Sequence, residues 1–220
     1  THVAVAAGKR VRIFDPTGRE LHTLSLSGNV RVIHWWPEHG LLLVGTDDEK
    51  VVAFDASGRK VWEFTSEMDP ELVRSGKYYW FKSEPGLHGI HGIGTGTFIN
   101  GKTQAFVGSA TTLEILDERG QLVRRMPTFW GLPSLFQVVP APDGSLNLLL
   151  GRKHGDSPRL FTVNNRRLSV TGQGFTSVPA GGTEFAGWMG GNRNFLFYED
   201  LDGSGRKVLV GDINGTFNRV

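Results

Sequence analysis

The stretch Val51–Phe64, VVAFDASGRKVWEF, reads as two short β-strands joined by a tight turn. The run Val51–Phe54 is apolar and β-prone, and a second strand restarts around Trp62. Asp55 stands at the first turn position, where its carboxylate can accept a backbone N–H. Gly58 stands where a positive φ or close packing is wanted. The stretch therefore predicts a β-hairpin.

The same order of strand, glycine, strand, aspartate, turn, glycine and strand recurs along the chain. Asp15 and Asp55 occupy matching positions 40 residues apart. Every copy after the first is preceded by one more apolar run, which gives four strands per unit at intervals of roughly 40 to 60 residues, near the period of propeller blades. The further copies are VAVAAGKRVRIFDPTGRELHTL, AFVGSATTLEILDERGQLVRRM, LNLLLGRKHGDSPRLFTVNNRRLSV and KVLVGDINGTFNRV.

These repeats predict a single all-β domain over residues 1–220, a β-propeller with about five four-stranded blade units. The first unit lacks its inner strand and the last lacks its outer strand, so we expect an imperfectly closed ring or part of a larger one. Residues 66–85 do not fit the repeat and predict an insertion with a short capped helix and an aromatic segment. The predicted units are 1–28, 29–65, 86–128, 132–172 and 182–220.

Composition excludes several classes of protein. Of the 220 residues, 39% are hydrophobic, enough to bury a core, and 24 basic residues balance 22 acidic ones. A nucleic-acid partner is therefore not expected, because that class requires a basic stripe. The absence of cysteine excludes disulfides and thiolate chemistry. No segment reaches the roughly 18 apolar residues of a membrane span.

The stretch AFDASGRKVWEF resembles the tryptophan-docking repeat of the quinoprotein (PQQ-like) β-propeller superfamily. Ala53, Asp55, Gly58 and Trp62 fall at that repeat's positions, and His22 takes the tryptophan position in the N-terminal copy. The resemblance implies a disc of four-stranded blades with the tryptophan packed between neighbours. PQQ itself is not expected, because quinoprotein enzymes are eight-bladed and many carry a vicinal cysteine pair.

A second stretch, DLDGSGRKVLVGDINGTF, is similar to FG-GAP or VCBS-type propeller repeats. Hybrids of the two repeat styles are frequent in secreted bacterial propellers, often beside carbohydrate-active domains. The resemblance therefore implies a secreted or periplasmic protein whose partner is a glycan, another protein or another domain of the same polypeptide. Asp200, Asp202 and Ser204 could give three oxygens to a structural calcium ion, and a metal-free turn is the alternative.

Two groups of side chains are candidates for chemistry or binding. On a strand, residues three apart point to opposite faces, which argues against a metal site shared by His88 and His91. Exposed tryptophans would stack on sugar rings, and the alternative is packing between blades. The candidates for catalysis are His88, His91, Tyr78 and Tyr79; those for binding are Trp35, Trp36, Trp80, Trp188 and His34.

Three functions remain open from the sequence. The first is a non-catalytic propeller that serves as a binding or scaffold module. The second is a lyase acting on acidic polysaccharides, which requires a histidine near a tyrosine and an arginine in one cleft. The third is an assembly scaffold, which a resemblance to the PQQ-like outer-membrane assembly lipoprotein allows. The first is preferred, because no Gly-x-Ser-x-Gly, phosphate-loop or His-Glu-x-x-His motif is present.

Overall fold

The computed structural model describes most of the N-terminal two thirds of the chain and shorter stretches beyond it. The described residues are 2–70, 74, 88–110, 112–128, 132–141, 143–153, 159–174, 183–188, 194–200, 206–212 and 217–219. Within them, no helix is long and apolar enough to cross a membrane. Strands dominate, and the described short helices include the 3-10 turns Pro37–His39 (η1) and Ile99–Gly101 (η3).

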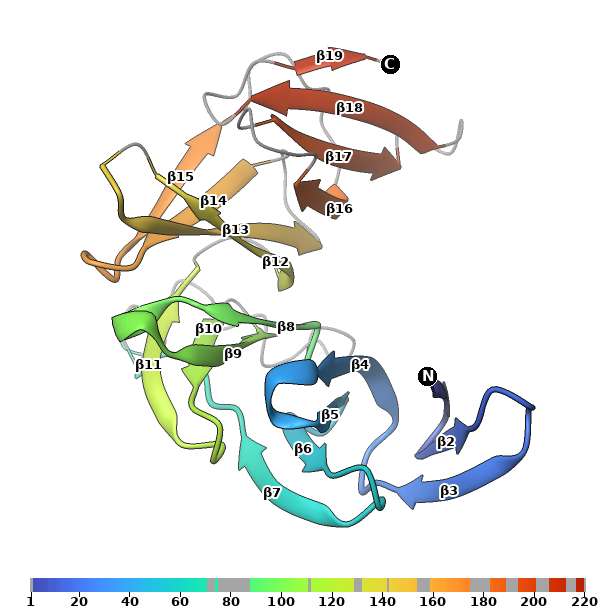
Figure 1. Cartoon of the computed structure of the whole chain (residues 1–220). Coiled ribbons are helices and arrows are strands. Elements are labelled where there is room, and N and C mark those ends of the chain that lie inside the picture. Colours follow the sequence, from blue (N-terminus) through green and yellow to red (C-terminus); the bar gives the residue numbers. More distant parts are fainter. Residues whose placement is uncertain are drawn as a thin grey trace.

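The strands form five antiparallel sheets, which we name A to E in chain order (Figure 1). Sheet A has three strands, and each of the others has four. Sheet A contains β1 (Val3–Ala7), β2 (Arg10–Phe14) and β3 (Glu20–Ser25); sheet B contains β4 (Val30–Trp36), β5 (Leu41–Thr46), β6 (Lys50–Phe54) and β7 (Lys60–Thr65). Sheet C contains β8 (Gly92–Thr97), β9 (Thr103–Ser109), β10 (Thr112–Leu116) and β11 (Leu122–Pro127). Sheet D contains β12 (Leu132–Pro140), β13 (Leu146–Lys153), β14 (Arg159–Asn164) and β15 (Val170–Gly174); sheet E contains β16 (Thr183–Trp188), β17 (Asn194–Asp200), β18 (Arg206–Asp212) and β19 (Phe217–Arg219).

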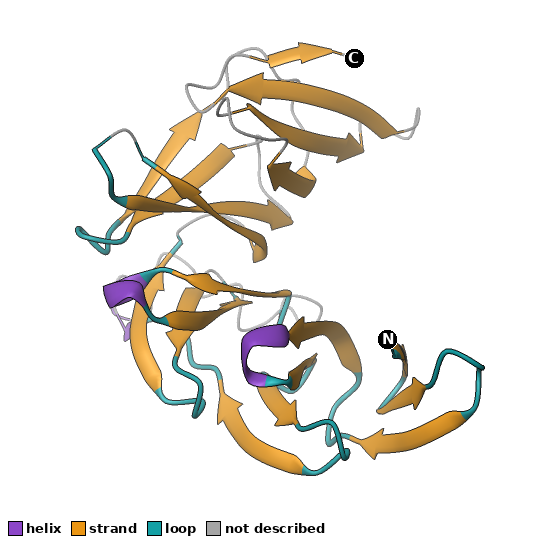
Figure 2. Cartoon of the chain, viewed as in Figure 1, coloured by secondary structure: helices purple, strands orange, loops and turns teal. Residues whose placement is uncertain are grey.

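The sheets follow one another along an arc in the order of the chain (Figures 1 and 2). Within sheets B to E, consecutive strands pair in sequence, so each sheet is a simple meander. The first strand of each sheet contacts the first strand of the next: β1 meets β4, β4 meets β8, β8 meets β12, and β12 meets β16. The first strands of the four-stranded sheets, β4, β8, β12 and β16, therefore form the inner side of the arc.

Apolar side chains fill the interfaces between successive sheets. On strands β5 and β6 of sheet B, alternate residues face opposite neighbouring sheets, as a strand with both faces buried requires. Leu42 and Val44 of β5 join Val11 and Leu24 of sheet A in one cluster. Leu43, with Val51 of β6, joins a second cluster that reaches sheet C.

The interface between sheets C and D depends on glycines. Gly92, Gly94 and Gly96 alternate along β8, so they share one face of the strand, and that face contacts β12. A Cβ at Gly92 would lie 2.3 Å from the carbonyl oxygen of Ser134. The run GIGTGTF therefore serves close backbone packing between two sheets.

Each predicted unit contains one sheet, apart from β15, which runs two residues past the predicted end of its unit at 172. The expectation that the last unit lacks its outer strand is wrong, because β19 pairs with β18 as the fourth strand of sheet E. The error arose at Asn194–Asp200. The repeat pattern places Gly211 in the second strand of its unit. In the structure residues 194–200 form the second strand, β17, and Gly211 lies in the third strand, β18.

The connections between sheets repeat one pattern of backbone hydrogen bonds. After sheet A, the N–H groups of Leu26 and Val30 donate to the carbonyls of Lys9 and Gly8. After sheet B, Ser66 and Ile90 donate to Glu49 and Thr46 in the same way. The two donors lie 4 residues apart in the first connection and 24 in the second. The predicted insertion at 66–85 therefore lengthens the connection between sheets B and C, which has a shorter counterpart between sheets A and B. The predicted capped helix and aromatic segment fall largely outside the described residues.

Candidate functional site

Three hairpins carry the aspartate turn that the sequence predicts. Asp55 Oδ1 accepts hydrogen bonds from the N–H groups of Ser57 and Arg59 and from the Ser57 hydroxyl, and its Oδ2 pairs with the Arg59 guanidinium. The hydrogen bond from the Ser57 hydroxyl is the main cause that lowers the pKa of Asp55 to about 2. Gly58 has φ of +77° and donates back to the Asp55 carbonyl. The turn is therefore held by its own residues.

These turns dock successive sheets. The Trp62 indole donates from Nε1 to the carbonyl oxygen of Glu118, 3.1 Å away in the turn of sheet C. A Cβ on Gly120 would lie 2.6 Å from the Trp62 ring, so glycine makes this close approach possible. His22 of sheet A occupies the matching place against Gly58 of sheet B, where a Cβ would lie 3.2 Å away. The predicted packing of Trp62 between neighbours is what the structure shows.

The candidate site is a cavity of about 670 Å³ between sheets A and B. Its volume lies within the range of ligand-binding cavities. Most of the lining residues are apolar. The lining residues are His2, Ala4, Ile13, Leu21, Ile33, His34, Trp35, Leu42, Asp55 and Ala56.

Two of the predicted binding residues, Trp35 and His34, line this cavity. Trp35 is 50% exposed. His34 is half-buried, and its Nε2 lies 3.0 Å from the Thr95 hydroxyl of β8. Burial lowers the pKa of His34, so the imidazole is neutral at pH 7. The site therefore offers the exposed ring of Trp35, whereas the His34 imidazole reaches toward β8 of sheet C.

Trp36 is placed differently from its neighbour. Its side chain is fully buried and belongs to the cluster between sheets B and C. Side chains of consecutive strand residues point to opposite faces, so on β4 the Trp36 side chain points toward sheet C and the Trp35 side chain toward sheet A. Trp36 is thus a packing residue and presents no ring face to a ligand. Trp80 and the side chain of Trp188 lie outside the described part of the structure.

The predicted histidines do not form a common site. His88 is half-buried, and its Nδ1 lies 3.0 Å from Oε1 of Glu49 in the β5–β6 loop. His91 is buried, and its backbone N–H donates to the carbonyl oxygen of Gly108. Tyr78 and Tyr79 lie outside the described residues. The cleft of histidine, tyrosine and arginine that a lyase requires stays a prediction.

No group of three or more histidine or acidic side chains in the described residues could hold a metal ion. The predicted calcium loop is described only at its first residue, Asp200, where β17 ends. Asp202 and Ser204 lie outside the described residues. Calcium binding at this loop therefore stays a prediction from the sequence.

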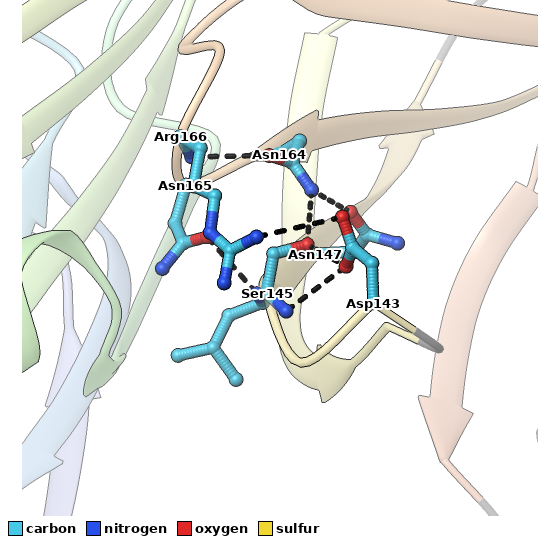
Figure 3. Close-up of polar contacts among 7 residues, drawn as sticks. Asp143, Ser145, Asn147, Asn164, Asn165 and Arg166 are labelled. Carbon is cyan, nitrogen blue, oxygen red and sulfur yellow. Dashed lines mark hydrogen bonds and ion pairs between the residues drawn. The ribbon is translucent and has the colours of Figure 1, made fainter.

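A polar network holds the turn that follows β12 (Figure 3). Asp143 accepts hydrogen bonds from the N–H and the hydroxyl of Ser145. Asn164 donates to Ser145 and to Asn147. Asn165 donates 3.1 Å to the carbonyl of Phe98 in sheet C. These contacts tie two hairpins of sheet D to each other and to sheet C, so the network is structural.

A buried carboxylate fastens the insertion to sheet C. Glu114 of β10 has no exposed surface, and burial raises its pKa. Its Oε1 accepts a hydrogen bond from the Arg125 guanidinium at 2.8 Å and from the Glu67 N–H at 3.2 Å. Arg125 also pairs with the Glu67 carboxylate. The sequence pattern did not predict this pair, because Glu114 lies in a mostly apolar strand.

Comparison with known proteins supports the fold. No family model matches the chain, and no curated protein matches it. The N-terminal domain of BBS1, solved in complex with ARL6, aligns with a TM-score of 0.67 and 13% identity over 99% of this chain and 60% of that one. Dihydro-heme d1 dehydrogenase NirN aligns with a TM-score of 0.66 and 11% identity over 100% of this chain and 44% of that one.

Both neighbours are β-propellers. This chain has a β-propeller fold. It spans less than two thirds of either neighbour, so only the arrangement of sheets is compared. The identities are too low for residue roles to transfer.

Proposed function

We propose that this propeller is a protein-interaction module and that the cavity between sheets A and B is its binding site. The observation that carries the proposal is the half-exposed Trp35, which faces an apolar cavity of about 670 Å³. Tryptophans in partly enclosed apolar surroundings are the side chains on which binding energy concentrates. The BBS1 neighbour, solved in complex with ARL6, supports a protein partner by analogy of fold alone.

The lining favours a peptide over a small charged ligand. Ala4, Ile13, Ile33 and Leu42 give apolar walls on both sheets, and the described lining carries one carboxylate, Asp55. That carboxylate is already occupied by its own turn. The His34 ring is held at Thr95 of β8, so the apolar walls and the Trp35 ring are left to contact the ligand.

A displayed library of random peptides, selected against the full chain, tests this proposal. We expect enriched peptides with alternating apolar residues whose binding is lost in Trp35→Ser. Val61→Ser is the matched control, because Val61 is 49% exposed on β7 of the same sheet but does not line the cavity. Peptides that bind both variants equally, or no enrichment at all, would contradict the proposal.

A glycan is the second candidate, because an exposed tryptophan such as Trp35 can also stack on a sugar ring. A glycan array distinguishes the two ligands. Glycan binding that disappears in Trp35→Ser, with no peptide selected, would replace the protein-interaction proposal with carbohydrate binding.

A further inference from the structure

Sheet C carries a second cavity, of about 330 Å³, at one end of its strands. In an antiparallel meander alternate loops lie at the same end of the sheet, so the β8–β9 and β10–β11 loops are neighbours. The first loop lines the cavity with Ile99, Asn100 and residues 102–104, and the second with residues 117–119; Val123 of β11 completes the described lining. None of these residues lines the cavity between sheets A and B, so this cavity is a separate candidate site.

Both loops are held in place by contacts that do not depend on a ligand. Gln104 is buried, and its side-chain amide exchanges hydrogen bonds of 2.9 and 3.0 Å with the backbone of Ile99. The Trp62 indole holds the second loop through the carbonyl oxygen of Glu118. A ligand that enters the cavity therefore does not have to order either loop, which lowers the entropic cost of binding.

The aspartate turn of sheet C leaves one carboxylate oxygen without a partner. In sheets A and B, the arginine four residues after the aspartate donates from Nε to the aspartate Oδ2, at 3.1 Å in both turns. In sheet C that position is Gln121, which donates its backbone N–H to Oδ1 of Asp117. No described residue donates a hydrogen bond to Oδ2 of Asp117. The Asp117 carboxylate, which lines the cavity, thus keeps a free oxygen.

The cavity also carries two cations that the turn does not use. Arg119 lies two residues after Asp117, where the other two turns have Thr17 and Ser57, whose hydroxyls bond to their aspartates. The Arg119 side chain is 81% exposed. Lys102 is exposed and, within the part of the chain that the structure describes, forms no ion pair. Both positive charges consequently stay available to a ligand.

Groups of opposite charge therefore surround one small cavity. Asp117 and Glu118 supply carboxylates, whereas Lys102 and Arg119 supply cations. The one ion pair that the structure describes among them joins Arg119 Nε to Glu118 Oε1 at 3.9 Å, which is too long for a hydrogen bond. A ligand with charges of both signs complements all four groups. The volume lies near the lower end of the range for ligand cavities, so the ligand is small.

We propose that this cavity binds a free α-amino acid in its zwitterionic form. The ligand carboxylate would lie at Lys102 and Arg119, and the ligand ammonium group would donate to Oδ2 of Asp117. Ile99 and Val123 supply apolar surface, which favours a short apolar side chain on the ligand. The inference goes beyond the proposed function, because the two cavities share no described lining residue.

A metal ion and an inorganic anion fit this cavity less well than a zwitterion. Lys102 and Arg119 would repel a metal ion, and within the described residues no group of three histidine or acidic side chains could hold one. Asp117 and Glu118 would repel phosphate in the same way. Each of these ions would be attracted by only half of the charged groups that line the cavity.

Calorimetric titration of the full chain with each standard free amino acid tests the proposal. We expect at least one with a short apolar side chain to bind with a Kd below about 1 mM. The N-acetylated form of that amino acid lacks the positive charge and its amide lacks the negative charge, so both should bind at least about tenfold more weakly. The inference is wrong if no amino acid binds in this range, or if either derivative binds as tightly as the free amino acid.

Gln121→Arg tests the assignment of the ammonium group and keeps the turn intact. Sheets A and B hold arginine at this position, so the substitution should give Asp117 Oδ2 the partner that it lacks. We expect amino-acid binding to weaken about fivefold or more, without loss of thermal stability. Gln121→Met is the matched control, because it changes the same exposed side chain without adding a charge, and it should bind like wild type. Equal affinities of the two variants would overturn the assignment.

Two further variants test the carboxylate end of the ligand and separate the two cavities. Lys102→Met should weaken amino-acid binding about threefold or more, and an unchanged affinity would contradict the placement of the ligand carboxylate. Trp35→Ser should leave amino-acid binding unchanged, because Trp35 lines the other cavity. Loss of amino-acid binding in Trp35→Ser would place the ligand there and overturn the inference. Peptide binding to Trp35→Ser tests the proposed function separately, so either proposal can fail alone.

Discussion

The indole Nε1 of Trp62 in sheet B donates a hydrogen bond to the main-chain carbonyl of Glu118 in sheet C. The two residues are separated by 56 positions in the sequence, so this contact joins two units that fold as separate meanders. The Trp62 ring also packs so closely on Gly120 that a side chain at position 120 would not fit. The relationship explains why Trp62 and the glycine of the next turn occur together in the repeat.

Replacement of Trp62 by alanine should lower the free energy of unfolding by about 2 kcal/mol or more, because it removes a large packed ring and leaves the Glu118 carbonyl without its donor. Urea unfolding followed by circular dichroism measures this loss. Val61→Ala is the control, because an exposed neighbour should change stability by less than about 0.5 kcal/mol. Equal effects of the two substitutions would show that the docking contact is dispensable.

Alanine substitutions at three glycines should rank by the space that each glycine leaves. A Cβ at Gly108 would lie 1.8 Å from the Pro133 carbonyl oxygen, and one at Gly96 would lie 3.0 Å from Val138. Gly92 lies between them at 2.3 Å from Ser134. We expect thermal stability to fall most for Gly108→Ala and least for Gly96→Ala. A reversed order in melting temperatures would contradict the packing of sheet C against sheet D.

Asp55 should stabilise its turn in a pH-dependent way. Its pKa is lowered from 3.8 to about 2, so its stabilising effect is present above pH 3.8 and is lost as the pH falls toward 2. The difference in melting temperature between wild type and Asp55→Asn should therefore close over that interval. A difference that stays constant down to pH 2 would show that the carboxylate charge has no part in the turn.

Glu114 should make stability depend on pH in the opposite direction to Asp55. Burial raises its pKa above the ordinary value of 4.5, so the folded state binds the proton more tightly than the unfolded state. Wild type should therefore lose stability relative to Glu114→Gln as the pH rises from 4.5 through the raised pKa. Melting temperatures of the two proteins between pH 4 and pH 8 measure this slope. A slope of the other sign would mean that Arg125 outweighs the cost of burial.

Local signals predicted the repeating architecture, because each aspartate turn needs only a few adjacent residues. Asp15 and Asp55 hold their turns with their own neighbours, and Trp62 marks a sheet interface through its place after such a turn. The repeat pattern did not predict β17 as a separate strand. Its run of four consecutive apolar residues at 195–198 was the available signal.

The candidate site was predicted only in part. Trp35 and His34 were named as binding residues, but the adjacent Trp36 proved to be buried, since alternation along β4 could not say which face was covered. Ala4 and Ile13 belong to sheet A and Leu42 to sheet B, so their meeting at one cavity depends on how two sheets pack. Among the described residues sheet A has three strands, as the missing inner strand of the first unit predicted.

Titration calorimetry with the tightest peptide from the displayed library, against wild type, Trp35→Ser and Val61→Ser of the full chain, tests the central claim most directly. The claim is that the cavity between sheets A and B binds a peptide against the exposed ring of Trp35. If it does, Trp35→Ser should lose binding, while Val61→Ser, which changes an exposed side chain away from the cavity, should bind like wild type. Peptide binding that Trp35→Ser leaves unchanged would contradict the claim.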